Sequence, residues 1–116
     1  MWKLTISERT TVPLIKAEKP WEAFTLGYGT VLHIGKKWHL WYESMDQNYR
    51  DDADRYFCYA TSDDGAHWDR PNLGLFSYDG ETDNNILFFG PGFIGPGGLT
   101  GATVFLDEKA AAPERF

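Results

Sequence analysis

Carboxyl groups are the side chains of this sequence that could do chemistry, and they gather in two places. Glu43 and Asp46 stand near the end of a predicted strand, Lys37–Ser44. The second group is the run Asp51-Asp52-Ala53-Asp54, whose carboxylate oxygens suit a hard cation such as calcium. Because the run lacks the spaced ligands and the glycine of a calcium-binding loop, we expect it to be a solvated loop.

Histidines and glycines give no sign of a metal or a cofactor. His33, His39 and His67 are not spaced from one another, or from a cysteine, as zinc ligands are. The glycine-rich stretch from Gly90 to Gly98 contains no lysine followed by serine or threonine, so it does not match a phosphate-binding loop. We therefore expect no metal site, no cofactor, and structural roles for the histidines.

The elements that must position these side chains are predicted to be strands. Apolar and aromatic residues alternate with period two, and turn residues bound each run. The predicted strands are Tyr28–Ile34, Lys37–Ser44, Asp54–Thr61 and Leu75–Tyr78, and a further strand opens at Gly101–Asp107. Gly35-Lys36 is expected to join the first two strands as a hairpin.

Both faces of the predicted sheet are largely apolar. In the second strand Trp38, Leu40 and Tyr42 point to one side, and His39, Trp41 and Glu43 to the other. A half-exposed sheet would alternate more cleanly between apolar and polar residues. This pattern is typical of a sheet stacked between two others.

Composition excludes several classes of partner. The formal net charge is −6 and no basic cluster is present, so nucleic acid is not expected. No apolar run approaches the length of a membrane span, and the N-terminus turns polar too quickly for a secretory signal. We expect a cytoplasmic protein without membrane contact, with a secreted parent that has lost its leader as the alternative.

Cys58 is the only cysteine, and its place inside a strand predicts a buried thiol rather than a reactive one.

A family resemblance rests on two strand segments and the turn that follows them. These are Trp38-His39-Leu40-Trp41-Tyr42-Glu43 and Tyr56-Phe57-Cys58-Tyr59-Ala60-Thr61, continuing into Ser62-Asp63-Asp64-Gly65-Ala66-His67-Trp68. Together they resemble the first blade of the five-bladed β-propeller glycoside hydrolases of families 32, 43 and 68 and their furanosidase-like relatives. The fold implied is all-β, an antiparallel four-stranded blade at about 24–80, a connecting loop at about 81–100, and a second blade from about 101. A chain of 116 residues holds too few blades to close such a ring, so we expect an N-terminal portion of a larger propeller.

The resemblance also implies where a sugar would bind. Such enzymes hold three acids from different blades in a funnel, because one carboxyl must protonate the leaving oxygen while another attacks or activates water. Strand direction then groups Thr25 to Tyr28, Trp41 to Asp46 and Asp54 to Tyr56 at the funnel end, and leaves Asp63, Asp64 and Trp68 with structural roles at the far end. The candidate catalytic acids are Glu43, aligned with a substrate-contacting Gln of the family, and Asp46, and the candidate substrate-binding residues are Tyr28, Trp41, Tyr42, Arg55 and Tyr56.

One departure from the family changes the expected activity. Leu26 occupies the place of the nucleophilic aspartate, and a leucine can neither attack an anomeric carbon nor activate water. Glu43 also has another interpretation, as a strand-end residue that is solvated or paired with Arg55.

We therefore expect a glycoside hydrolase-like, furanosidase-type propeller fragment that is inactive by itself. Its expected partners are a glycan or furanoside sugar and either further blades of the same protein or identical copies in a homo-oligomer. The alternatives are a non-catalytic carbohydrate-binding or self-assembling partial propeller, and a small β-sandwich unrelated to sugars.

Overall fold

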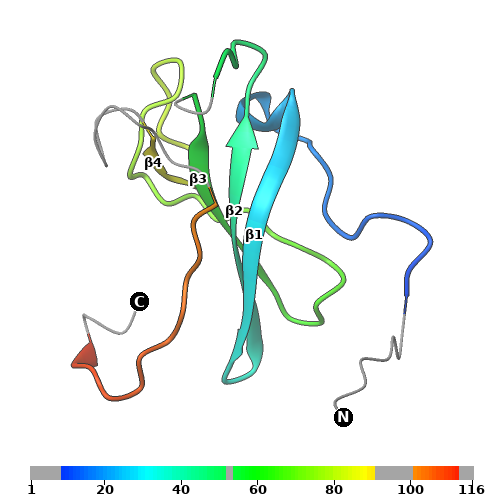
Figure 1. Cartoon of the computed structure of the whole chain (residues 1–116), viewed down its shortest axis with the longest axis vertical. Coiled ribbons are helices and arrows are strands. Elements are labelled where there is room, and N and C mark those ends of the chain that lie inside the picture. Colours follow the sequence, from blue (N-terminus) through cyan, green and yellow to red (C-terminus); the bar gives the residue numbers. More distant parts are fainter. Residues whose placement is uncertain (1–8, 52–53, 91–100, 113–116) are drawn as a thin grey trace.

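The fold is a single four-stranded antiparallel sheet in which the strands lie in their chain order, β1-β2-β3-β4 (Figure 1). The computed structural model describes residues 9–51, 54–90 and 101–112. The strands are β1 Thr25–Ile34, β2 Lys37–Met45, β3 Tyr56–Ser62 and β4 Ile86–Phe89, and one short 3₁₀ helix, η1 Pro20–Glu22, precedes them. The predicted all-β class and antiparallel four-stranded sheet are thus confirmed.

The β1–β2 hairpin forms where the sequence predicts it. Ile34 pairs with Lys37 across the turn, and Gly35 adopts a φ of 64°, a conformation that suits glycine and the two-residue turns of hairpins. Farther along, Thr25 pairs with Met45, although a register shift between Leu26 and Gly29 interrupts the ladder. The hairpin is therefore a long ribbon with a bulge near its open end.

The fourth strand does not lie at Leu75–Tyr78, as the sequence predicted, but at Ile86–Phe89. Tyr78 makes only an isolated bridge to Glu81, across a turn in which Asp79 and Gly80 both have positive φ. Ile86 instead pairs with Cys58 of β3 and is fully buried. The earlier apolar run was mistaken for a strand because a tight Asp-Gly turn folds it back before it can pair with β3.

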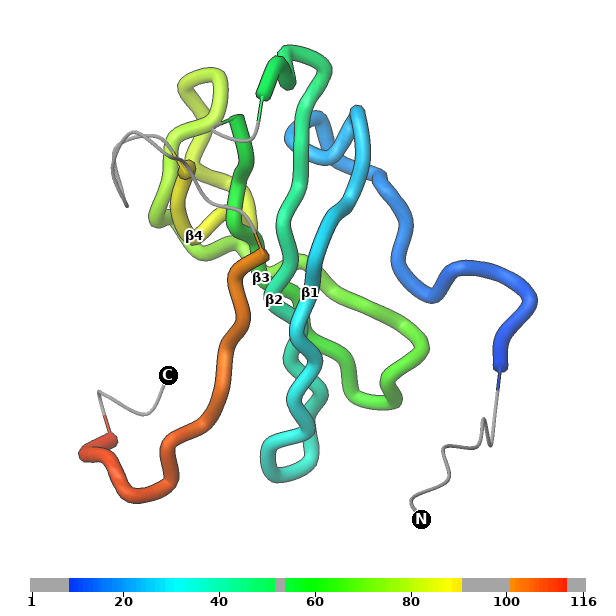
Figure 2. Tube along the Cα trace, viewed as in Figure 1, coloured from blue at the N-terminus to red at the C-terminus, as the bar shows by residue number. Residues whose placement is uncertain are grey.

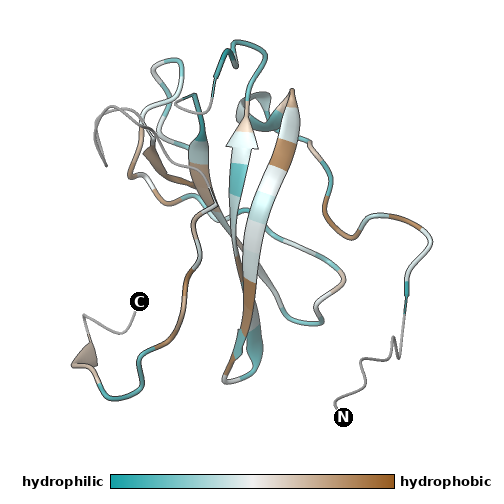
Figure 3. Ribbon diagram, viewed as in Figure 1, coloured by the Kyte–Doolittle hydropathy of each residue, from teal (hydrophilic) through white to brown (hydrophobic). Residues whose placement is uncertain are grey.

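One face of the sheet, here called the packed face, carries the hydrophobic core. Its buried residues are Trp21, Leu40, Tyr42, Cys58, Ala60 and Ile86, and partly buried side chains from the loops, such as Phe76 and Trp68, pack against them. Apolar residues, brown in Figure 3, colour β3 and β4, whereas the turn of the β1–β2 hairpin is mostly hydrophilic. Leu40 and Tyr42 share this face, as their alternation predicted.

The opposite face, here called the aromatic face, carries His39, Trp41, Glu43, Phe57 and Tyr59, which alternate with the core residues along β2 and β3. An extended segment, residues 101–106, crosses it (Figure 2). Thr30 Oγ1 lies 2.9 Å from Thr103 Oγ1 and accepts a hydrogen bond of 3.3 Å from the backbone N–H of Val104. Within the described residues this segment pairs with no strand, so the strand predicted at Gly101–Asp107 is present only as an extended chain.

Candidate functional site

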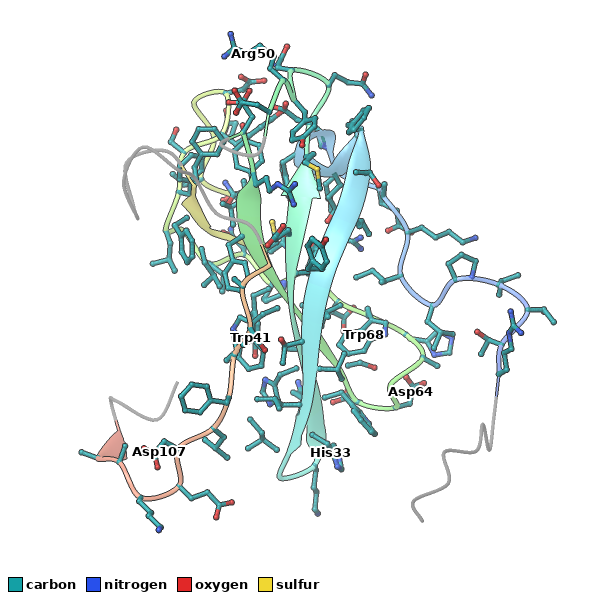
Figure 4. All side chains as sticks on the ribbon, in the orientation of Figure 1. His33, Trp41, Arg50, Asp64, Trp68 and Asp107 are labelled. Atoms are coloured by element: carbon teal, nitrogen blue, oxygen red, sulfur yellow. The ribbon has the colours of Figure 1, made fainter. Side chains whose placement is uncertain are left out.

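Strand register brings the predicted site segments together at one end of the sheet, here called the site end. Thr25 pairs with Met45, and Ser44 pairs with Tyr56, so the start of β1, the end of β2 and the start of β3 are neighbours. Arg50 marks this end in Figure 4, whereas Asp64 and Trp68 lie toward the other end. The predicted separation of the Asp-Gly turn from the candidate acids therefore agrees with the structure.

Glu43 is fully buried, and both of its carboxylate oxygens are engaged. Arg55 Nη1 donates to Oε2 at 2.6 Å, and the backbone N–H groups of Gly101 and Ala102 donate to Oε1 at 2.6 and 3.2 Å. The pairing with Arg55 is the alternative that the sequence left open for Glu43. Its carboxylate joins three segments, namely β2, the residue that precedes β3 and the chain at residues 101–102.

Asp46, the second candidate acid, is 6% exposed and is held by two tyrosines. The hydroxyls of Tyr56 and Tyr78 donate to Oδ2 at 3.2 and 3.1 Å, and the Asn48 N–H donates to Oδ1 at 2.8 Å. Burial and the nearby Asp46 charge raise the pKa of Tyr56, and burial together with the same carboxylate raises the pKa of Tyr78 to about 12. Both tyrosines therefore stay protonated at neutral pH and act as donors to Asp46. Asp46, Asn48 and Tyr56 border a pocket of about 220 Å³ that Arg50 and Asp54 also line.

The five candidate substrate-binding residues differ widely in exposure. Tyr28 is 62% exposed and Trp41 is partly exposed, whereas Tyr42 and Arg55 are buried and Tyr56 is half-buried against Asp46. Burial, followed by the charges of Cys58 and Glu22, raises the pKa of Tyr42, so this hydroxyl also stays protonated. Of the five, Tyr28 and Trp41 are the two whose rings a ligand could reach without rearrangement of the core.

Trp41 belongs to a row of three rings on the aromatic face. Its ring centroid lies 5.3 Å from that of Tyr59 and 5.9 Å from that of His39, and His39 Nδ1 and the Tyr59 hydroxyl are hydrogen-bonded at 2.5 Å. Burial, with Lys37 nearby, lowers the pKa of His39, which favours the neutral imidazole at neutral pH. The row is an uncharged aromatic surface, and Trp41 lies near the extended segment in the view of Figure 4.

Sequence reasoning missed a buried polar network centred on Glu22. Arg70 Nε and Nη2 donate to the Glu22 carboxylate at 2.7 and 2.9 Å, and the Tyr42 hydroxyl donates to it at 2.5 Å. The Asn85 amide donates to the Tyr42 hydroxyl at 2.8 Å and accepts a bond from Trp21 Nε1 at 3.0 Å. The acid and the base are 48 residues apart, so no local pattern signals the pair. The sequence hints at this network only by placing polar residues beside apolar ones, at Trp21-Glu22 and at Asn84-Asn85 before Ile86.

The turn after β3 is organised by Asp64, which supports the structural role expected for it. Asp64 Oδ1 accepts the N–H groups of Ala66 and His67, both at 2.8 Å, and Oδ2 pairs with His67 Nδ1 at 2.7 Å. The Ser62 hydroxyl accepts the N–H of Gly65, whose φ of 77° suits glycine. These hydrogen bonds lower the pKa of Asp64, and the Asp64 carboxylate raises the pKa of His67.

This turn predicts a pH dependence of stability. His67, with its pKa raised above 6.5, stabilises the fold fully below that pH and less as the pH rises through its folded pKa. Asp64, with its pKa lowered below 3.8, contributes above that pH and less as the pH falls. We expect His67→Gln to reduce the free energy of unfolding more at pH 5.5 than at pH 8.5, measured by urea denaturation. The matched control is His33→Gln, which replaces a histidine that stacks on Trp38. An equal effect of His67→Gln on the free energy of unfolding at both pH values would contradict the assignment.

Three further observations limit the chemistry of the described residues. Cys58 is buried and burial raises the pKa of its thiol to about 12, so it is unreactive. Within residues 9–51, 54–90 and 101–112 no three His, Cys, Asp or Glu side chains are grouped as metal ligands would be. In the same part of the chain no helix has the length and apolar character needed to span a membrane.

Comparisons with protein-family models, with curated proteins and with solved structures find no match to this chain.

Proposed function

We propose that this chain is a carbohydrate-binding, blade-like unit of the glycoside hydrolase propeller type, and that it does not hydrolyse glycosides by itself. The fold is compatible with this proposal, because a propeller blade is a four-stranded antiparallel sheet with neighbours in chain order. The extended segment that contacts Thr30 on the aromatic face also supports the proposal, because the first strand of a following blade would lie against this sheet. The furanoside class of sugar comes from the family resemblance of the sequence.

The partly exposed row of Trp41, His39 and Tyr59 is the observation that carries the binding part of the proposal. Sugar rings have apolar C–H faces that stack on aromatic side chains, and their hydroxyls need polar neighbours. The row supplies both, since the Tyr59 hydroxyl and the His39 ring nitrogens are polar atoms carried by its rings. The absence of charge from these rings suits a neutral sugar.

The state of the two candidate acids argues against hydrolysis by this chain alone. A glycosidase needs one carboxyl that can donate a proton and another that can attack or activate water. Glu43 is committed to Arg55 and two backbone N–H groups, and Asp46 to two tyrosines and Asn48. Leu26 packs against the core at the position where the family has its nucleophile.

Binding is tested with Trp41→Ala and calorimetric titration of a fructo-oligosaccharide and an arabino-oligosaccharide. Loss of the stacking surface should weaken binding by roughly fivefold to tenfold, since an aromatic contact contributes about 1 kcal/mol beyond its burial. Trp38→Ala is the matched control. Trp38 is a partly buried tryptophan on the same strand as Trp41, but it lies on the packed face, where it stacks on His33. Equal loss in both variants, or no binding by the unmodified chain, would reject the proposal. Release of reducing sugar that Glu43→Gln abolishes would overturn its non-catalytic part.

A further inference from the structure

Strand β1 is an edge of the sheet, and beyond its bulge between Leu26 and Gly29 it carries none of the charges or prolines that protect most edge strands. It pairs with β2 on one side, and among the described residues no strand pairs with its other side. Natural edge strands are usually short, or carry lysine, another charge or proline that discourages a second chain from pairing. β1 is ten residues long, Thr-Leu-Gly-Tyr-Gly-Thr-Val-Leu-His-Ile, and contains no charged residue and no proline.

The geometry of the hairpin shows which backbone groups are available at this edge. Ile34 and Lys37 close a two-residue turn, and in such a hairpin the closing residues bond to each other. Because residues of an antiparallel pair alternate between bonding inward and outward, Gly29, Val31 and His33 direct their N–H and C=O groups away from β2. The free edge therefore offers three successive bonding positions centred on Val31.

Exposed apolar side chains accompany these backbone groups. Tyr28 is 62% exposed and Val31 is 49% exposed. Val31 also borders an apolar pocket of about 600 Å³ that Leu14, Trp38 and Trp68 line on the packed face. A strand added at this edge would extend the sheet and shield part of that apolar surface.

We propose that β1 pairs antiparallel with β1 of a second copy of this chain, about a two-fold axis at Val31. In this register Val31 faces Val31 of the second copy, and Gly29 faces His33, so all three outward positions of each copy meet outward positions of the other. A two-fold pairing places each central residue close to its own counterpart, and like charges placed opposite each other are destabilising. The absence of charge throughout β1 therefore favours self-pairing, even though each copy carries a net charge of −6. The proposal does not depend on sugar binding.

Sedimentation of the full chain at several concentrations tests the association. The unmodified chain should form a concentration-dependent dimer, and Val31→Lys should shift it to monomer, because two ammonium groups would meet at the axis. Leu75→Lys introduces the same charge at a residue that is 65% exposed and distant in sequence from β1, so it should leave the dimer unchanged. A chain that is monomeric at every concentration, or a dimer that Val31→Lys leaves intact, would overturn the proposal.

A cysteine placed at the axis tests the register without relying on the folding of the lysine variant. Facing residues of a bonded antiparallel pair have Cα atoms about 5.5 Å apart, within the range of a disulfide. Val31→Cys should therefore form a covalent dimer under mild oxidation, whereas Leu75→Cys should not. The native Cys58 is buried and does not compete. Failure of Val31→Cys to cross-link more than Leu75→Cys would exclude this pairing even if the chain dimerises.

Discussion

Replacing Glu22 by alanine is expected to lower the free energy of unfolding by about 3–5 kcal/mol, the range observed when one partner of a buried ion pair is removed. The carboxylate is fully buried, and the side chain of Arg70 is only 7% exposed. In the variant Arg70 keeps its bonds to the Lys16 carbonyl and to the exposed Glu18 carboxylate, but it loses two charged hydrogen bonds to Glu22. The Tyr42 hydroxyl loses its acceptor. Urea denaturation monitored by tryptophan fluorescence measures the loss.

Glu18→Ala is the matched control for this prediction. Glu18 contacts the same guanidinium, with its Oε2 3.4 Å from Arg70 Nη1, but its side chain is 63% exposed. An exposed pair contributes about 0–1 kcal/mol, so the control should change stability little. The combination of Glu22→Ala with Arg70→Met should cost less than the sum of the single changes, because no unpaired charge remains. Equal effects of Glu18→Ala and Glu22→Ala would show that the buried network does not stabilise the fold.

Glu43→Ala is the second change with a large expected effect, again about 3–5 kcal/mol of unfolding free energy. It removes the Glu43 carboxylate from the buried Arg55 guanidinium and from the N–H groups of Gly101 and Ala102. Those two bonds join the chain at residues 101–102 to the sheet, so we also expect amide hydrogen exchange at Gly101 and Ala102 to become at least about tenfold faster. Losing one hydrogen bond of about 1.4 kcal/mol changes an opening equilibrium by that factor. Denaturation and hydrogen exchange together measure both effects.

Asp54→Ala is the control for Glu43. Asp54 pairs with Arg50, whose side chain is 84% exposed, so its removal should cost no more than about 1 kcal/mol. The experiment also distinguishes a structural from a functional Glu43. A Glu43→Gln variant that keeps its stability but loses sugar affinity would show that the carboxylate serves a ligand, contrary to the burial and pairing described above.

Local patterns predicted much of the sheet. Alternating residues and the Gly35 turn placed β1, β2 and β3 within a few residues of their observed bounds, because hairpin neighbours are close in sequence and their turns are encoded locally. The grouping of the start of β1 with the end of β2 and the start of β3 followed from strand direction alone. The burial of Cys58 likewise followed from its place within a strand.

The fourth strand shows where local patterns become insufficient. The runs at Leu75–Tyr78 and Ile86–Phe89 are both short and apolar, and period-two alternation cannot choose between them. The choice depends on which run reaches the free edge of β3. Ile86 does so by pairing with Cys58, whereas the Asp79-Gly80 turn folds Tyr78 back toward Trp21, with ring centroids 5.6 Å apart.

The sequence by itself therefore determined an antiparallel, aromatic-rich sheet and the end of it at which its candidate acids gather. Only the tertiary structure decided the state of those acids. Glu43 is paired with Arg55 and accepts hydrogen bonds from the backbone N–H groups of Gly101 and Ala102, which are 58 and 59 positions later in the chain. Glu22, which no motif marked, is paired with Arg70. Whether a carboxylate is free or committed depends on the donors that packing brings to it from distant segments, and residue spacing along the chain does not contain that information.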